Sequence, residues 1–560
     1  MPITHSSNWK DALEHEQQHQ VRSTFSFALS ERMISLAIFF SCLAYLCIFL
    51  RYSTIEPDEG IVLQGAERIL HGEVPYRDFF SFYTPGSFYL VAFIFKMFGD
   101  SFSVARASLA LAGAICSLVT YLLARRTCSR GISVFTALLT TTTGIAFRFL
   151  VLHNIYSTLL CSLALYAAVR FLETERPLWA WITGSLASLT FLFEQSKGAG
   201  LCAGLLLAFL IVFVFFPHRP LDKFSFVALI SGLAWPLLVT FGYFAKKGAL
   251  KLTMQSWLWP LHHYTQANRV PYGFQNWSDH AREIIFHTGP VWVRAVKIIA
   301  ISPGLLIPVL PLIAVAMLVF WTIRIRPTSV EDSKQSRYYL LVCATLSGLL
   351  LSVVLVRADI LHFMYLTPLW YVVLAWILGS VGVRSGLLPM IRPYLIAYVC
   401  AAFGLLGLAL LFTATGARNR IETRRGTLTT SDRDTVIEYV QSQVAPDGPL
   451  LVYPYLPLYN YLTATRSPSR YHYFQSGMNT GDQAQEIVGS LKSHADSPVL
   501  FEPWFPEKIA NSWPGTPLGA IASDPVTDYI SRNYRVCKML SSPDGWRFHY
   551  MVRRNALCPR

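Results

Sequence analysis

The 560-residue chain is 53% hydrophobic and only 14% charged, which excludes an ordinary soluble protein, in which about a quarter of the residues are charged. Of its net charge of +14, most lies in residues 1–413, which hold 31 Lys and Arg against 20 Asp and Glu, whereas residues 414–560 hold 16 against 13. This excess in the more apolar part favours contact with lipid headgroups or a phosphorylated lipid and argues against binding of nucleic acid.

The apolar residues cluster in runs of about 16 to 25, the length that a helix needs to cross a bilayer. They predict a polytopic α-helical membrane protein with about eleven transmembrane helices. The predicted ranges are 33–50, 102–124, 132–147, 155–172, 178–193, 199–216, 224–245, 296–320, 338–356, 363–383 and 393–413. Residues 33–413 are therefore expected to form the membrane domain.

The distribution of basic residues predicts the orientation. Arg125, Arg126 and Arg130 share one short loop, and further Lys and Arg residues occupy alternate later loops. Because short cytoplasmic loops are enriched in Lys and Arg, the N-terminal segment 1–32 is expected to be cytoplasmic. An odd number of spans then places residues 414–560 on the outer side of the membrane, together with two long loops at about 51–101 and 246–295.

The first outside loop is expected to contain two helices that lie on the membrane surface. After Asp58, apolar residues recur at helical spacing (Ile61, Gly65 and Ile69), which predicts an amphipathic helix. Its sequence EPDEG (56–60) is also a suitable helix start, with Asp58 as a cap, Glu59 near the positive end of the helix dipole and Glu56 solvated. The stretch 83–100 predicts a second surface helix.

Ionisable residues gather at the outer ends of the predicted spans, where they are candidates for a functional site. Besides Asp58 and Glu59, they are Arg148, His153, Glu194, Lys197, Arg357, Asp359 and His362. Structural alternatives stay open for several of them: Glu194 and Lys197 are spaced for an ion pair, and a single His such as His153 is more often a structural group. The tryptophans of WLWPLHHYTQ (257–266) are expected to anchor the membrane interface, and His262 with His263 is a weaker metal candidate.

Residues 414–560 predict a small α/β domain. A helix is expected in SDRDTVIEYVQSQV (431–444), capped by Ser431 or Asp432. Strands are expected in PLLVYP and SPVLFEP, and a hairpin in YRVCKML with WRFHYMV. Cys537 and Cys558 are the two cysteines of this part, and they are either free or joined in a disulfide outside the cytoplasm.

The first outside loop resembles that of the GT-C membrane glycosyltransferases: the protein O-mannosyltransferases, the lipid A aminoarabinose transferase and the bacterial galacturonosyltransferase-like enzymes. The matching stretches are PDEG (57–60), AERILHGEVPYRDF (66–79), YTPGSFYL (83–90) and GDSFSVAR (99–106). RADILHFMYLTPLW (357–370) and YPYLPLYNYLTATRSPSRYHYF (453–474) extend the resemblance toward the C-terminus. It implies a GT-C fold in a membrane protein, with the bacterial inner membrane as the expected location and a periplasmic C-terminal domain.

The resemblance also implies an activity: transfer of a sugar from a polyprenyl-phosphate donor to a lipid, glycan or protein acceptor, with Asp58 as the catalytic base. The chemistry is consistent, because an attacking hydroxyl must lose a proton to a carboxylate. Arg148, Lys197 and Arg357 are candidates for stabilising the leaving phosphate. Many relatives carry an arginine where Met364 stands, and Arg357 is expected to replace it.

Two other functions compete with this interpretation. A transporter or lipid flippase would have charges in mid-span, broken helices and related halves; Pro303, Pro308 and Pro311 do interrupt one span. A non-catalytic assembly subunit would be indifferent to replacement of Asp58. No cofactor is required by the predicted reaction, although the paired acids leave a divalent metal as an alternative.

Overall fold

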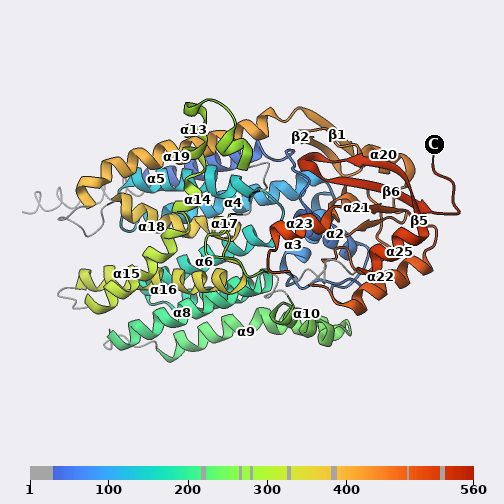
Figure 1. Cartoon of the computed structure of the whole chain (residues 1–560). Helices are drawn as coiled ribbons and strands as arrows, with labels where there is room; N and C mark the ends of the chain where they lie inside the picture. Colours follow the sequence, from blue (N-terminus) through green and yellow to red (C-terminus); the bar gives the residue numbers. More distant parts are fainter. Residues whose placement is uncertain are drawn as a thin grey trace, which may run out of the picture.

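The computed structural model describes residues 30–215, 222–263, 268–275, 277, 282–324, 330–379, 388–475, 478–516 and 524–559. Long helices occupy one end of the molecule and a small α/β domain the other (Figure 1). This arrangement confirms the predicted fold class: an integral membrane protein with a helical membrane domain followed by a C-terminal α/β domain.

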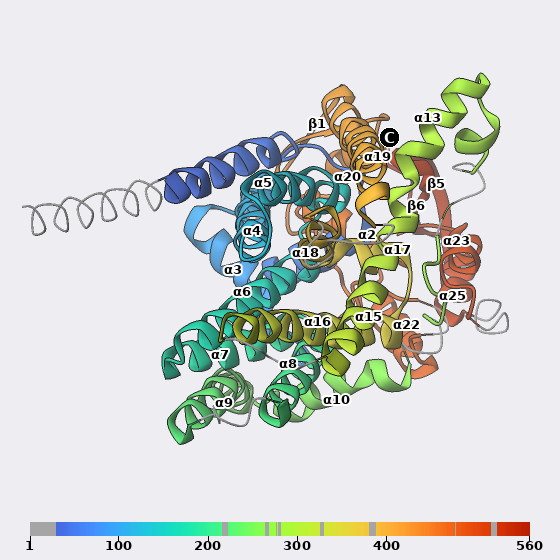
Figure 2. The same cartoon turned by 90° about the vertical axis from the view of Figure 1, so that its left-hand side faces the viewer.

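Eight helical segments in the described part of the chain are long and apolar enough to cross a bilayer. They are Ser30–Cys47, α4 (Phe102–Ala124), α6 (His153–Thr174), α8 (Gln195–Phe215), α9 (Lys223–Lys246), the run of α13 (Val291–Ile301), α14 (Pro303–Leu306) and α15 (Val309–Arg324), α16 (Val330–Val356) and α19 (Leu388–Gly416). Two further predicted spans are shorter helices, α7 (Pro177–Phe193) and α18 (Thr367–Gly379). In the helical end view, α7, α8, α9 and α16 lie together on one side of the bundle (Figure 2).

The segment predicted as span 132–147 is a broken helix. It consists of α5 (Arg130–Leu139), a π-helical stretch η1 (Thr140–Ile145) and a 3-10 turn η2 (Ala146–Arg148). Four consecutive threonines, from Thr140 to Thr143, each donate a hydroxyl hydrogen bond to the carbonyl four residues earlier. Such bonds compete with the regular helix ladder and bend it, and the chain then leaves the helix at Arg148.

Small residues allow α8 and α16 to pack closely. A Cβ atom added to Gly204 would lie 2.6 Å from Thr345 Cα, and one added to Gly348 would lie 2.2 Å from the carbonyl oxygen of Gly200. Larger side chains would force these helices apart, as is typical of helix contacts inside membranes.

The first outside loop contains α2 (Pro57–Leu70) and α3 (Gly86–Phe98). The amphipathic helix predicted at the start of this loop is α2, and its polar residues Gln64 and Glu67 are buried. The C-terminal domain covers α2: a Cβ atom on Gly60 would lie 2.1 Å from the backbone nitrogen of Leu458, and Glu67 is ion-paired with Arg425. An amphipathic pattern identifies two faces but not which partner covers each one.

The C-terminal domain contains two sheets. The hairpin β1 (Asn419–Thr423) and β2 (Gly426–Thr430) stands apart from a four-stranded sheet of order β3-β4-β6-β5. This sheet consists of β3 (Leu451–Tyr453), β4 (Val499–Phe501), β5 (Tyr534–Ser541) and β6 (Arg547–Arg553). Its β3–β4 pair is parallel and the others are antiparallel, which confirms the predicted strands and hairpin.

Helices cover this domain: α20 (Val436–Gln443), α21 (Leu458–Leu462), α22 (Gly481–Ser493), α23 (Phe505–Ser512) and α25 (Pro525–Asn533). The predicted cap of α20 is wrong. The carboxylate of Asp434, rather than Ser431 or Asp432, accepts hydrogen bonds from the backbone amides of Val436 and Ile437, because the helix begins later than its polar sequence indicates.

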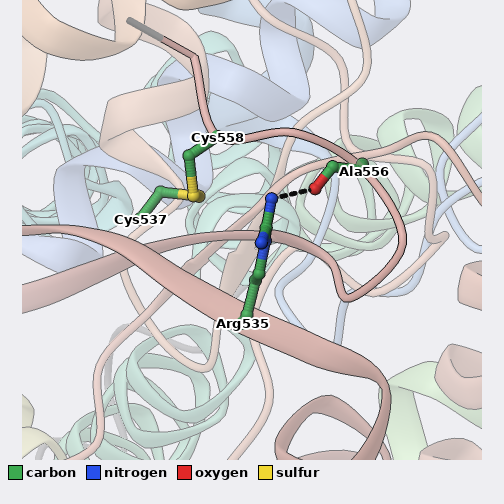
Figure 3. The surroundings of a disulfide bond; sticks show 4 residues. All are labelled: Arg535, Cys537, Ala556 and Cys558. Carbon is green, nitrogen blue, oxygen red and sulfur yellow. Dashed lines mark hydrogen bonds between the residues drawn. A yellow bond between two sulfur atoms is a disulfide. The ribbon is translucent and has the colours of Figure 1, made fainter.

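Cys537 and Cys558 form a disulfide that ties the end of the chain to β5 (Figure 3). Beside it, Arg535 donates a hydrogen bond to the carbonyl of Ala556. Disulfides persist in oxidising compartments, so the bond agrees with a C-terminal domain outside the cytoplasm.

This bond predicts a specific thiol count. Of the ten cysteines in the chain, eight are free, so a maleimide reagent should label eight thiols in the unfolded, unreduced protein and ten after reduction. Mass spectrometry of the labelled chain provides the measurement. A Cys537→Ser variant should label at nine sites under both conditions, and ten labels without reductant would contradict the pairing.

Candidate functional site

A cavity of about 1570 Å³ lies between the membrane helices and the C-terminal domain. One part of its wall is polar and includes Asp58 at the start of α2, together with Arg148, Glu194 and Arg357 at the ends of membrane segments. The other part is apolar and comes from positions further along α8, α9, α16 and α10 (Leu250–His262); it includes Ala203, Phe241, Leu258, Leu351 and Leu355. The cavity therefore suits a molecule with a polar head and a hydrocarbon chain.

Asp58 lies at the cavity wall in the first turn of α2, directly after Pro57 at the first helical position. Its Oδ2 is 2.9 Å from Nη2 of Arg148, and its Oδ1 accepts a 3.1 Å hydrogen bond from the hydroxyl of Tyr455. Glu56 also lines the cavity, 3.4 Å from the same guanidinium. Partial burial raises the pKa of Glu56 against the opposing effect of Arg148, while 34% of its side chain stays exposed at the cavity.

Glu59 points away from the cavity. Its two carboxylate oxygens each lie 2.6 Å from the guanidinium of Arg106, and Oε1 also accepts a 2.9 Å hydrogen bond from the amide of Val151. Both side chains are buried, at 0% exposure for Glu59 and 2% for Arg106. The structure therefore places Glu59 as an anchor for α2, whereas Asp58 reaches the cavity.

Arg357, Asp359 and His362 form a second charged group on the cavity wall. Asp359 caps α17 (Ile360–Tyr365) by accepting from the amide of His362, and it also binds Nδ1 of that imidazole at 2.6 Å and the guanidinium of Arg357. Burial opposes the charge of Asp359, but His362 and Arg357 outweigh it, so the pKa of Asp359 is lowered. Arg357 also donates to Oδ1 of Asn268 at 3.1 Å and to the carbonyl of Ser512 at 2.5 Å.

Glu194 lines the cavity, and Lys197 lies behind it. The ammonium of Lys197 is 2.8 Å from Glu194, and it also donates to the hydroxyls of Ser157 and Thr158 and to the carbonyl of Asn154. Burial opposes the charge of Glu194, but Lys197 and His153 more than compensate, which lowers the pKa of Glu194. The ion pair that the spacing allowed is thus present.

His153 stands at the start of α6 on the cavity wall, with its ring centroid 4.3 Å from that of Tyr83. Its Nδ1 is buried without a hydrogen-bond partner.

The C-terminal domain supplies residues that the sequence analysis missed. Tyr455 binds Asp58, Ser512 binds Arg357, and Tyr473, Gln475 and Trp513 line the cavity. The aromatic-rich stretch 453–474 was a signal for some of them, but nothing in it indicated which side chains turn toward the membrane domain.

The tryptophans of α10 are not interface anchors. Trp257 and Trp259 are only 8% and 9% exposed; Trp257 donates to the hydroxyl of Tyr76, and Trp259 stacks on Phe82. His263 stacks on Trp259 in turn. Within the described residues, no group of three or more His, Cys, Asp or Glu side chains is arranged to hold a metal ion.

The buried pair of Glu59 and Arg106 predicts a stability effect. Arg106→Met leaves a buried carboxylate without its counterion, which typically costs about 3–5 kcal/mol, and should markedly lower the unfolding temperature in detergent. The matched control is Arg420→Met, which removes an exposed pair with Glu422 and should leave that temperature essentially unchanged. Equal effects of the two substitutions would contradict an anchoring role.

Comparison with known proteins adds two findings. Residues 83–244 match the family model described as dolichyl-phosphate-mannose-protein mannosyltransferase. Among curated proteins, none matches the chain in sequence.

Solved structures are similar at low identity. The oligosaccharyltransferase of Archaeoglobus fulgidus, in a complex with zinc and sulfate, is 11% identical, with a TM-score of 0.51 over 92% of this chain and 72% of that one. ArnT from Cupriavidus metallidurans bound to undecaprenyl phosphate is 13% identical, with a TM-score of 0.44 over 96% of this chain and 99% of that one. The first of these likenesses supports a shared fold. Together with the family model, it confirms the resemblance to the GT-C membrane glycosyltransferases, whose fold this chain has.

Proposed function

We propose that this protein transfers a sugar from a polyprenyl-phosphate donor to an acceptor hydroxyl at the membrane face where the C-terminal domain lies. The observation that carries the proposal is the cavity itself, in which the Asp58 carboxylate shares a wall with the Arg148 and Arg357 guanidiniums. The family whose model matches residues 83–244 is named for a sugar carried on dolichyl phosphate, and we extend that class of donor to this chain.

The cavity supports a lipid donor. A sugar phosphate would occupy the polar part, and the polyprenyl chain would lie along the apolar positions of α8 and α16. Because such a chain would come from the hydrocarbon of the bilayer rather than from water, its contacts with the cavity would be van der Waals packing. The apolar part of the cavity would hold the donor while the polar part positions its reactive carbon.

In the proposed reaction the acceptor oxygen attacks the anomeric carbon, and the bond from that carbon to the phosphate oxygen breaks. Asp58 takes the proton from the acceptor hydroxyl as the new bond forms. The electron pair of the broken bond leaves with the lipid phosphate, and Arg148 and Arg357 stabilise its charge. Attack from the side opposite the phosphate inverts the anomeric configuration.

The remaining site residues orient the charged groups or face the sugar. Asp359 and Asn268 orient Arg357, and His362 orients Asp359. Lys197 keeps Glu194 ionised at the cavity wall, where Glu194 and His153 can bind sugar hydroxyls. A lipid, a glycan or a protein would serve as acceptor. We propose that the reaction takes place on the periplasmic side of a bacterial inner membrane, with the N-terminal segment in the cytoplasm.

The test is sugar transfer in isolated membranes from a panel of labelled polyprenyl-phosphate sugars. Asp58→Asn keeps the size of the side chain but removes the basic carboxylate, so transfer should fall by about 10²- to 10⁴-fold, the usual contribution of a general base. The rate of label transfer to the membrane acceptor is the measurement.

Asp482→Asn is the matched control, because Asp482 is an exposed acid on α22 of the C-terminal domain. It should transfer at the rate of the unmodified protein. A folded Asp58→Asn variant with undiminished transfer would remove Asp58 from the reaction, and an unmodified protein that transfers no sugar from any donor would contradict the proposed function.

A further inference from the structure

A buried amide on the cavity wall has no hydrogen-bond partner. Gln475 is 0% exposed and lines the cavity, yet neither its Nε2 nor its Oε1 has a partner. Among the cavity-lining residues that the structure describes, Gln475 is the one whose complete side-chain amide lacks partners. Leaving such groups unpaired destabilises the folded protein, and native proteins retain few of them.

The backbone holds Gln475 in place. Its amide nitrogen donates to Oδ1 of Asn479 at 2.9 Å, and its carbonyl accepts from the amides of Met478 and Asn479 at 3.0 and 2.9 Å. The amide side chain therefore starts from a fixed point, which is what a binding group needs in order to be selective.

The segment that contains Gln475 contacts both charged groups of the site. Before it, Tyr473 contacts Tyr455 with a ring separation of 5.9 Å, and Tyr455 binds Asp58. After it, the Met478 sulfur accepts from Asn268, which binds Arg357. In the proposed reaction the sugar must lie between the base and the cation, so it is the part of the donor that comes nearest to this segment.

The chemistry of the amide selects the kind of group that it can bind. An amide offers a donor and an acceptor, and a sugar hydroxyl can satisfy both because it also donates and accepts. A phosphate or carboxylate would leave Oε1 unpaired, and an ammonium group would leave Nε2 unpaired. The unpaired amide therefore fits a neutral, hydroxyl-bearing part of the ligand better than its phosphate.

We infer that Gln475 binds a hydroxyl group of the transferred sugar and helps to determine which sugar is accepted. This inference rests on the proposed function, since it assigns the sugar subsite of the same cavity. It gives the C-terminal domain a part in donor selection, through a residue that contacts the sugar rather than the phosphate or the lipid chain.

The test compares Gln475→Met with the unmodified protein, using the preferred donor and deoxy analogues that each lack one sugar hydroxyl. Methionine has a similar length and no amide, so kcat/KM for the full sugar should fall about tenfold or more, as expected for one lost hydrogen bond to a buried polar group. For one deoxy analogue, the two proteins should differ little, because that analogue already lacks the contact.

The unfolding temperature separates binding from a structural role. Because the unpaired amide is a cost to the folded protein, Gln475→Met should unfold at the same or a higher temperature. Gln441 is the matched control, since its amide is bonded to the backbone of Arg424 and of Glu422. Gln441→Met should lower the unfolding temperature and leave kcat/KM unchanged.

Binding of the sugar can also be measured without catalysis. A polyprenyl-phosphate sugar should raise the unfolding temperature of the unmodified protein more than bare polyprenyl phosphate does, and Gln475→Met should remove most of that difference. If the difference is present but no sugar is transferred, the inference holds and the proposed function fails. Unchanged kcat/KM for every donor, or an unchanged difference in stabilisation, would overturn the inference.

Discussion

The buried ion pair of Glu59 with Arg106 is the contact on which the geometry of the site depends. Successive residues of an α-helix point about 100° apart, so a helix that buries Glu59 in the protein must turn Asp58 in another direction. That direction is the cavity. The same Glu59 carboxylate accepts a hydrogen bond from the backbone amide of Val151. Val151 lies only three residues after Arg148 in the chain. One anchored acid thus positions both the carboxylate and the guanidinium that meet at the cavity wall.

The C-terminal domain completes this arrangement from the other side. It covers α2 through the close approach of Leu458 to Gly60, places the Tyr455 hydroxyl on Asp58 and places the carbonyl of Ser512 on Arg357. Without these contacts the two charged groups would open toward water, where ion pairs are weak. The domain therefore belongs to the site, although it has no catalytic group of its own in the proposed reaction.

Sequence reasoning predicted the helical membrane domain and the α/β tail with its hairpin, because periodicity and local motifs contain that information. It also named Asp58 as a site candidate, and the structure places this residue at the cavity wall. It did not predict the directions of neighbouring side chains. Glu59 and Lys197 looked equivalent to the cavity residues, but their partners Arg106, Ser157 and Thr158 come from other segments. Gln475 was missed for the same reason, since only the folded chain shows which polar groups have no partner.

The charges of the cavity bear on how a donor would bind. Arg148 is shared by Asp58 and Glu56, Arg357 is bound to Asp359, and Lys197 is bound to Glu194. These pairs limit the cost of holding charges out of water, so a lipid phosphate would have to exchange with a carboxylate rather than find an uncompensated cation. In the proposed mechanism that exchange has a consequence: when Arg148 turns to the phosphate, the Asp58 carboxylate is released from its ion pair and can accept the proton of the acceptor hydroxyl. Donor binding and activation of the base would then be one event, which keeps the carboxylate paired until there is a sugar to transfer.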